Sequence, residues 1–279
     1  MAAVAPVSTP ERTGSPKPWL SPTIGLIAGV ASGLLGVGGG FLIVPLQITW
    51  AKTEPHQASG TSLAAILPIA VVGSARYYLG GHSPQANLHA ALLLVIGSMA
   101  GAYLGARAVD SVPRRALLIL VAAILAVVGA YEVVGVVLRP DLVTGNPQPL
   151  QLDVPQSLLM AAAGAVIGIL SGLTGVGGGV FLVPAMVLGF GLSQHVAQGT
   201  SLVAILPTAA VGAFIHSRQG NVDCRAAAWI GGIGAPAAVL GASLALALPQ
   251  TVLILIFGAF LLVAASRMWP GRAPMGSTR

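Results

Sequence analysis

The sequence predicts an all-α polytopic membrane protein built from two homologous four-segment repeats, and two observations lead to this fold class. The first is composition: of 279 residues only 7% are charged and 55% are hydrophobic, and the mean hydropathy is +0.88. Soluble domains carry roughly 25% charged residues. A chain this apolar cannot cover its hydrophobic surface in water, so we expect an integral membrane protein.

The second observation is an internal repeat at an offset of 139 residues, since the stretch 33–45 recurs as 172–184. Between 29–73 and 168–212, 24 of 45 positions are identical. A repeat of this kind indicates a duplicated unit. The predicted organisation is a disordered N-terminal tail (1–19), membrane repeat 1 (20–138), a linker (139–155), membrane repeat 2 (156–268) and a C-terminal tail (269–279).

A glycine run interrupts the first apolar segment of each repeat. Segment 20–51 is cut at 36–40, and segment 156–192 is cut at 175–179. Each glycine costs about 1 kcal/mol relative to alanine in a helix, so these runs predict true helix breaks. In the first repeat the resulting half-helices, about 22–35 and 41–51, are each too short to cross a bilayer. Two arrangements satisfy the pattern: a re-entrant hairpin, or one interrupted helix.

The remaining apolar segments are 58–79, 87–108 and 114–138 in the first repeat, and 196–217, 225–247 and 250–268 in the second. Gly97, Gly101 and Gly105 form a small-residue face in one of them, and Gly231, Pro236 and Gly241 mark its counterpart. Such faces favour close helix packing. The packing partner is either another helix of the same protomer or a second copy in a homo-oligomer.

The basic residues indicate an orientation. If both glycine-broken segments turn back without crossing, eleven Lys and Arg residues lie on the amino-terminal side and only Arg76 and Arg139 lie opposite. If all eight segments cross, the division is nine to four. The positive-inside bias favours the first arrangement. It predicts inverted repeats, as in many secondary transporters, with both termini cytoplasmic and the protein in the cytoplasmic (inner) membrane.

The repeated motif resembles a known family. Each copy reads Gly-x-x-x-Gly-x-x-Gly-x-Gly-Gly-Gly-x-x-x-x-Pro and is followed by Ala-x-Gly-Thr-Ser-Leu. This doubled pattern is similar to that of the sulfite exporter TauE/SafE family (toluenesulfonate uptake permease-type). The loop 218–223 resembles the family's pattern too, whereas the first repeat has no Asp in its equivalent loop. The resemblance implies a transporter of sulfite, organosulfonates or related sulfur oxyanions.

The glycine breaks are the candidate anion-binding elements. Irregular backbone inside a membrane persists only where it is buried in protein or lines a cavity. The free N–H groups at a half-helix N-terminus bind anions without a charged side chain. The alternative is that the glycines only allow tight packing and the nearby hydroxyls only cap helices. The candidate substrate-binding residues are Gly38, Gly39, Gly40, Thr61, Ser62, Gly177, Gly178, Gly179, Thr200 and Ser201.

Two equivalent histidines, His56 and His195, precede the Thr-Ser pairs and are candidates for a proton relay. The competing interpretation is that each bonds a loop carbonyl at the membrane interface. Arg76 and Arg218 are candidates for attracting anions, or simple interfacial anchors. Glu132 is the acidic residue that comes nearest to the middle of an apolar segment, and its place near a helix end gives no strong prediction of ion coupling.

Other functional classes find little support in the sequence. The sole cysteine, Cys224, excludes an intramolecular disulfide and a Cys-rich metal site. No basic cluster interleaved with aromatics predicts nucleic-acid binding. We expect no cofactor, no metal and no enzymatic activity, with a small anion and membrane lipid as partners. The alternative functions are a polytopic membrane enzyme or a membrane assembly protein without transport activity.

Overall fold

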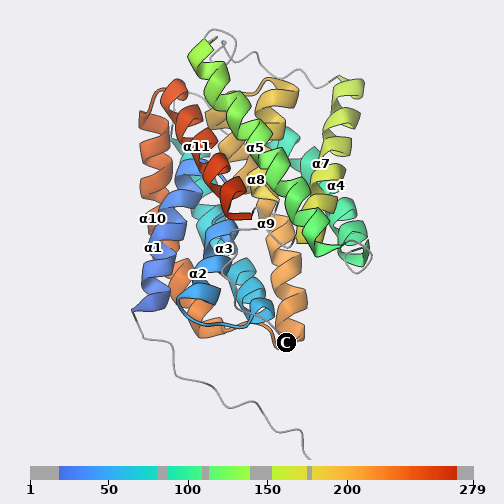
Figure 1. The fold of residues 1–279 in the computed structure, drawn as a ribbon. Helices are drawn as coiled ribbons and strands as arrows, with labels where there is room; N and C mark the ends of the chain where they lie inside the picture. Colours follow the sequence, from blue (N-terminus) through green and yellow to red (C-terminus); the bar gives the residue numbers. More distant parts are fainter. Residues whose placement is uncertain (1–18, 81–86, 109–112, 139–152, 175–177, 269–279) are drawn as a thin grey trace, which may run out of the picture.

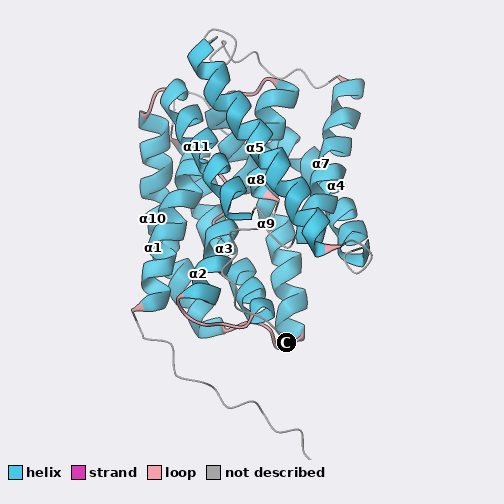
Figure 2. Cartoon of the chain, viewed as in Figure 1, coloured by secondary structure: helices cyan, strands magenta, loops and turns pink. Residues whose placement is uncertain are grey.

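The computed structural model describes residues 19–80, 87–108, 113–138, 153–174 and 178–268, and within these ranges the chain forms helices and no strands (Figures 1 and 2). The helices are α1 (Leu20–Leu35), α2 (Gly40–Thr49), α3 (Pro55–Leu79), α4 (Leu88–Ala108), α5 (Arg114–Leu138), α7 (Val154–Thr174), α8 (Gly179–Pro184), the π-helical turn η2 (Ala185–Gly189), α9 (Gln194–Arg218), α10 (Cys224–Ala247) and α11 (Gln250–Met268).

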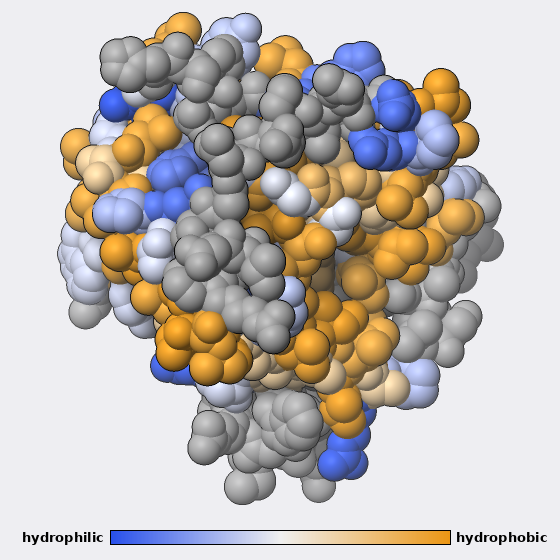
Figure 3. All heavy atoms as spheres, turned by 90° about the horizontal axis from the view of Figure 1, so that it is seen from above, coloured by the Kyte–Doolittle hydropathy of each residue, from blue (hydrophilic) through white to orange (hydrophobic). Residues whose placement is uncertain are grey.

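Six of the described helices, α3, α5, α7, α9, α10 and α11, are long and apolar enough to cross a membrane. The predicted helical membrane protein is therefore confirmed. Large apolar side chains such as Leu92, Val127 and Leu240 are exposed on the outside of the bundle. Exposed apolar side chains along the helices suit contact with lipid rather than water. Figure 3 looks down on one end of the bundle, where hydrophobic residues are visible between the grey atoms and several hydrophilic ones lie toward the rim.

The helix boundaries follow the predicted segments, with one correction. The helices α3 and α9 begin three and two residues earlier than expected, at Pro55 and Gln194. Proline suits the first helical position, and the Ser193 side chain caps α9 by accepting a hydrogen bond from the Val196 N–H. The Thr-Ser pairs consequently lie in the second turn of each helix, not the first.

The two halves of the chain pack into each other through glycine faces. The helix α1 lies along α10, where Gly29 abuts Gly234, and α7 lies along α4. At both Gly97 and Gly101 of α4, an added Cβ would collide with the backbone of α7. The tight packing predicted for these two glycines is thus confirmed, and it occurs within the protomer. The contacts of Gly105 lie outside the described residues.

The direction of each helix follows from which residues meet. Along α1 and α10 the meeting residues advance together, Gly25 with Ile230 and then Gly29 with Gly234, so these helices are parallel. The helices α3 and α9 are antiparallel, because Gly73 meets Leu202 whereas Gly212 meets Leu63.

The helix α3 is parallel to α10 and therefore also to α1. Its Pro68 meets Gly231, and its Arg76 bonds Ser243 further along both helices. The chain reverses between α1 and α3, through the glycine break and α2 (Figure 1).

Candidate functional site

The first glycine break joins the end of α1 to the start of α2. Gly36 ends α1 in the left-handed region with φ 71°, and its N–H donates to the Ser32 carbonyl at 2.8 Å. Gly38 and Gly39 also have positive φ, 77° each, a conformation that favours glycine. The Gly39 carbonyl accepts the first N–H bonds of α2, while no side chain caps that N-terminus. The predicted helix break is confirmed here, and its cause is the backbone conformation.

The second break repeats this arrangement where it is described. The N–H groups of Phe181 and Leu182 donate to the Gly178 carbonyl at 3.0 and 3.1 Å. Gly178 has φ 59°, and again no side chain caps the helix that follows. Gly177 lies outside the described residues. At the start of α2, whose N-cap residue is Gly39, no capping side chain takes up the first backbone N–H groups, and free N–H groups suit a helix terminus to an anion.

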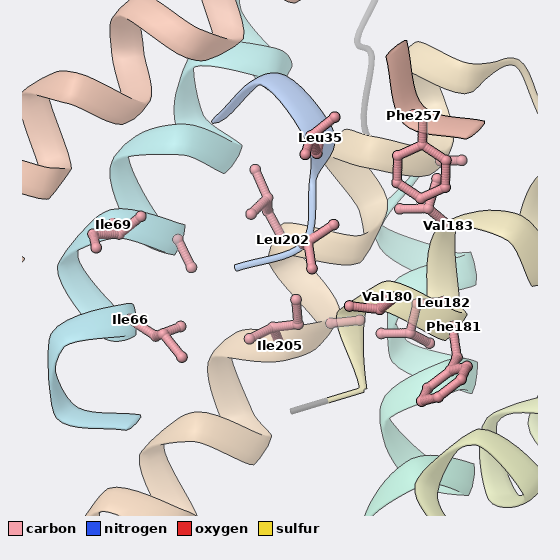
Figure 4. Packing of buried hydrophobic residues seen from close by; sticks show 14 of the residues in the cluster. Leu35, Ile66, Ile69, Val180, Phe181, Leu182, Val183, Leu202, Ile205 and Phe257 are labelled. Atoms are coloured by element: carbon pink, nitrogen blue, oxygen red, sulfur yellow. The ribbon is translucent and has the colours of Figure 1, made fainter. Parts of the chain in front are cut away.

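The two breaks touch at the centre of the protein. A Cβ added to Gly179 would lie 2.5 Å from the Val37 carbonyl oxygen of the first break and 2.7 Å from Ile205 Cδ1. A Cβ at Gly38 would lie 3.0 Å from the same Ile205 atom and 3.7 Å from Ile66 Cγ2. In Figure 4, Ile66 of α3 and Ile205 of α9 point toward one another. This repeat-related pair fills the space over the break, so the centre is closed.

Ser32 is a buried hydroxyl beside the first break that our sequence reasoning missed. Its side chain is 1% exposed, and its Oγ has no hydrogen-bond partner among the described residues. It lines a cavity of about 10 Å³ together with Gly39, Phe41 and Phe260. That volume is near the minimum for one water molecule. The identity of Ser32 with Ser171 in the repeat was the signal that could have identified it.

A polar stripe on α9 leads from the start of that helix to the first break. Gln194, Gln198 and Ser201 are fully buried and recur at helical spacing on one face. Ser201 donates to the Gly36 carbonyl at 2.6 Å. The amide nitrogens of both glutamines have no partner among the described residues. We call Gln194, Gln198 and Ser201 the α9 stripe. The sequence signal was its 4-then-3 spacing, which sequence analysis did not use.

Tyr77 of α3 completes the polar surroundings of the stripe. Its hydroxyl lies 2.8 Å from the Gly33 carbonyl and 2.8 Å from Gln198 Oε1. It thereby links the end of α3 to the last turn of α1 and to α9. The arrangement offers an anion neutral donors and no cation. Neutral donors bind an anion by hydrogen bonds in a medium of low dielectric, where such bonds are strong.

The sequence profile of the family described as "Sulfite exporter TauE/SafE" matches residues 1–132 and 160–278, most of the chain. The chain belongs to this family.

Similar proteins carry matching descriptions. A probable membrane transporter protein of Haemophilus influenzae is 28% identical over 88% of this chain and 96% of its own length. The probable membrane transporter protein YunE of Bacillus subtilis is 29% identical over 75% and 84%. The TauE/SafE family protein 3 of Arabidopsis thaliana, named a sulfite exporter, is 30% identical over 41% of this chain and 24% of its own.

The predicted hydroxyls of this TauE/SafE protein divide between two places. Ser201 lies at the break, and Ser62 is buried at the equivalent position of α3. Thr61 and Thr200 instead hold the starts of other helices. The Thr61 Oγ1 accepts from the Asp223 N–H at 3.0 Å, next to α10, and the Thr200 Oγ1 accepts from the Asn87 N–H at 2.9 Å, next to α4.

The predicted histidines and arginines lie away from the breaks. His56 is exposed in the first turn of α3, and a ring nitrogen of His195 lies 2.9 Å from the Ala245 carbonyl near the end of α10. Arg76 donates from Nε to the Ser243 Oγ at 2.8 Å, and the exposed Arg218 guanidinium stacks 4.6 Å from the centre of the Phe214 ring. These contacts are what interfacial anchors make.

Proposed function

We propose that this TauE/SafE protein is a secondary transporter that moves a small oxyanion, of the sulfite, organosulfonate or related sulfur oxyanion class, across the cytoplasmic membrane. The observation that carries the proposal is the pair of unpartnered, buried donors beside the first glycine break. They are the amide of Gln198, whose Cα would lie 2.5 Å from a Cβ added to Gly36, and the hydroxyl of Ser32, and the unpartnered amide of Gln194 follows one turn away on α9. Buried polar groups usually have partners, so several orphans around one point suggest a ligand.

The anion would be bound without a lysine or arginine. The N-terminus of α2 supplies backbone N–H groups and a partial positive charge, and the Ser32 hydroxyl and stripe amides add donors on either side. Such a site compensates an oxyanion's charge weakly enough for release, which a transporter needs. The relative from Arabidopsis thaliana that is named a sulfite exporter supports this substrate class, and the relatives named membrane transporters support transport alone.

Passage requires a second conformation, because Ile66 and Ile205 close the centre in this one. We propose that they separate when the two repeats rock against each other, as in alternating access. The α9 stripe would then form the route from the end where α9 begins, and the opposite route would open along α3. The two glycine breaks would stay in place and form the binding site in both conformations.

We further propose that the repeats are inverted and that α1–α2 and α7–α8 are re-entrant hairpins. The antiparallel direction of the equivalent helices α3 and α9 supports inversion. The reversal between α1 and α3 supports re-entry. The helix directions assign each basic residue to one end of the bundle. Arg76 lies at the end opposite the start of α1, and the end where α1 begins carries the exposed residues Lys52, Arg115, Arg218, Arg225 and Arg267. The positive-inside rule makes the first end cytoplasmic.

Flux into liposomes tests the function. The purified protein is reconstituted and offered sulfite, sulfate, thiosulfate, taurine and sulfoacetate, with empty liposomes as the control. We expect saturable flux of at least one of these anions. Flux or binding of none of them would overturn the proposal and favour an enzyme or an assembly protein.

Substitutions at the first break test the site. Ser32→Ala removes a hydroxyl that has no partner, so the fold should be kept. Hydrogen bonds to a charged group contribute about 1.5–3 kcal/mol, which predicts a roughly 10- to 100-fold loss of apparent affinity. Gly39→Leu should abolish flux, since Gly39 has φ 77°. Ser98→Ala is the control, because Ser98 bonds the Val95 carbonyl of its own helix. Unchanged affinity in Ser32→Ala would remove Ser32 from the site.

A further inference from the structure

Glu132 occupies a place that its sequence position did not predict. It lies within the apolar span Arg115–Leu138 of α5, six residues before the end of the helix. At 1.5 Å per residue this is about 9 Å inside the helix end. Its side chain is 1% exposed, and neither carboxyl oxygen has a hydrogen-bond partner among the described residues. Glu132 thus lies near a helix end, as the sequence indicates, and is nevertheless fully buried.

The carboxyl is enclosed by a close crossing of α5 and α11. A Cβ added to Gly258 of α11 would lie 3.4 Å from Glu132 Cβ and 2.8 Å from Val133 Cγ2. Gly129 faces the same point, one turn away, with its added Cβ 2.9 Å from the Gly258 carbonyl oxygen. Two glycines allow the helices to approach here. The approach removes the space that water would need to reach the carboxyl.

No cation compensates Glu132 among the described residues. The helices packed against α5 are α11 and α7. Over its described length α7 carries no charged or titratable residue, and the one charged residue of α11, Arg267, is exposed nine residues beyond Gly258. On α5 itself, Arg115 is exposed near the opposite end, and Tyr131 is exposed as well. Arg114 is at that same far end of α5.

An ionised carboxylate in such a place carries a large desolvation penalty, whereas the protonated acid does not. The two protonation forms consequently favour different packings. The protonated form suits the closed α5–α11 crossing, and the ionised form suits a crossing that admits water. A group of this kind converts proton binding into a shift between two conformations.

The helix α11 connects this crossing to the proposed anion site. Phe260, two residues after Gly258, packs edge-on against Phe41 with ring centres 5.5 Å apart. Phe41 follows directly on the first residue of α2, and Phe260 lines the cavity that Ser32 and Gly39 share. A movement of α11 at Gly258 would therefore displace the aromatic cover over the start of α2.

We propose that Glu132 is the proton-binding site through which this transporter couples proton movement to anion movement, with α11 as the connecting element. The proposal rests on the proposed transport function and adds the coupling ion, which the family membership does not supply. The proton is taken up when the α5–α11 crossing closes and released when it opens.

The test compares the wild-type protein with Glu132→Gln in liposomes that contain a pH-sensitive dye. Each anion that the wild type carries is assayed with and without an imposed pH gradient. The wild type should move protons with the anion, and a pH gradient should drive the anion. In Glu132→Gln, exchange down the anion gradient should persist, while proton movement and the response to pH should be lost. Glu132→Asp should retain both.

The outcomes separate the two proposals. A wild type that carries no anion overturns the transport function itself. Anion flux without proton movement in the wild type, or proton movement that persists in Glu132→Gln, overturns the role of Glu132. If the proton is instead carried on the sulfite anion itself, proton movement will persist in Glu132→Gln. That outcome assigns the proton to the substrate and not to Glu132. An infrared band of a protonated carboxyl group, present in the wild type and absent in Glu132→Gln, reports proton binding independently of flux, and its absence from the wild type counts against the proposal.

Discussion

Where both glycine breaks are described, at Gly39 and Gly178, each has a positive φ and a carbonyl that accepts the first helical N–H bonds, but the breaks continue into unequal half-helices. After the first, α2 runs for 10 residues as a regular α-helix. After the second, α8 lasts 6 residues and passes into the 5-residue π-helical turn η2. The prolines Pro45 and Pro184 occupy equivalent positions in both. A widened turn of this kind is frequent at functional sites. Identical motifs therefore fix the break itself and leave the following turns free to diverge.

The side chains around the breaks differ more than the breaks do. The α9 stripe places Gln194 and Gln198 on the way to the first break, whereas the equivalent positions of α3 are Pro55 and Ser59. The two glutamines of the α9 stripe therefore have no glutamine counterparts on α3. The two access routes of the proposed cycle are chemically distinct, and the directions of entry and release need not be equivalent.

The largest effect is expected from a substitution that forces the two glycine breaks apart. Gly179→Ala would drive a Cβ to 2.5 Å from the Val37 carbonyl, where backbone must shift. Overpacking of this type costs about 1–3 kcal/mol. We expect a lower melting temperature in detergent and loss of most anion flux.

Gly232→Ala is the matched control for that substitution. Gly232 lies inside α10 with nothing within 4 Å of an added Cβ. It should be neutral or stabilise the protein by up to about 1 kcal/mol, because alanine favours helix over glycine. Equal behaviour of the two variants would show that the contact between the breaks is unimportant.

The next comparison is the difference between the two central isoleucine variants, which should be smaller than the cost of truncating either isoleucine. Ile205 lies against both breaks, 3.0 Å from a Cβ added to Gly38 and 2.7 Å from one added to Gly179, whereas Ile66 lies 3.7 Å from a Cβ added to Gly38. Truncating a buried isoleucine costs about 2–5 kcal/mol. We expect Ile205→Ala to be less stable than Ile66→Ala in thermal unfolding and to pass anions faster in liposomes. Faster flux in neither variant would argue against their role as the closing pair.

The smallest effect concerns the turn after each half-helix. Lys52 has φ 54°, and its repeat equivalent Gly191 has φ 64°. Left-handed backbone costs a side-chain-bearing residue roughly 1–2 kcal/mol. Gly191→Ala should therefore destabilise the protein by about 1 kcal/mol, with no steric contribution because nothing lies within 4 Å of an added Cβ.

The reciprocal change, Lys52→Gly, relieves the strain in the first turn. Part of that gain is offset because glycine also loosens the unfolded chain, by about 0.4–1 kcal/mol. We expect a small increase in unfolding free energy, measured by denaturant titration in detergent. A marked loss of stability would mean that the Lys52 side chain makes a contribution that its exposure does not suggest.

Much of the fold could be predicted from the sequence because its signals are local. Apolar length determines a membrane helix, and a glycine run determines a break, so α5 and α11 begin and end where predicted. The repeat register also placed the two breaks in equivalent positions. The division of the chain into repeats and tails stays a prediction, as do the binding roles of the glycines and hydroxyls.

The pairing of helices could not be predicted, because it depends on contacts between distant residues. Nothing local indicates that Gly29 meets Gly234, or that Thr61 holds the start of α10. Prediction of the site met the same limit. The sequence shows that Ser32 recurs as Ser171 and that Glu132 stands in an apolar segment, but the burial of these side chains and the absence of partners cannot be read from single polar residues.

The exchange of partners between halves has a consequence for biogenesis. As the chain leaves the ribosome, α1 enters the membrane long before α10, the helix that covers its glycine face, has been made. Insertion of individual helices must therefore precede their assembly, in two stages. In a nascent first half, the glycine face of α1 is therefore exposed to lipid until translation is almost complete. Truncated products would thus be natural substrates for membrane quality control, and two separately expressed halves should mature only in each other's presence.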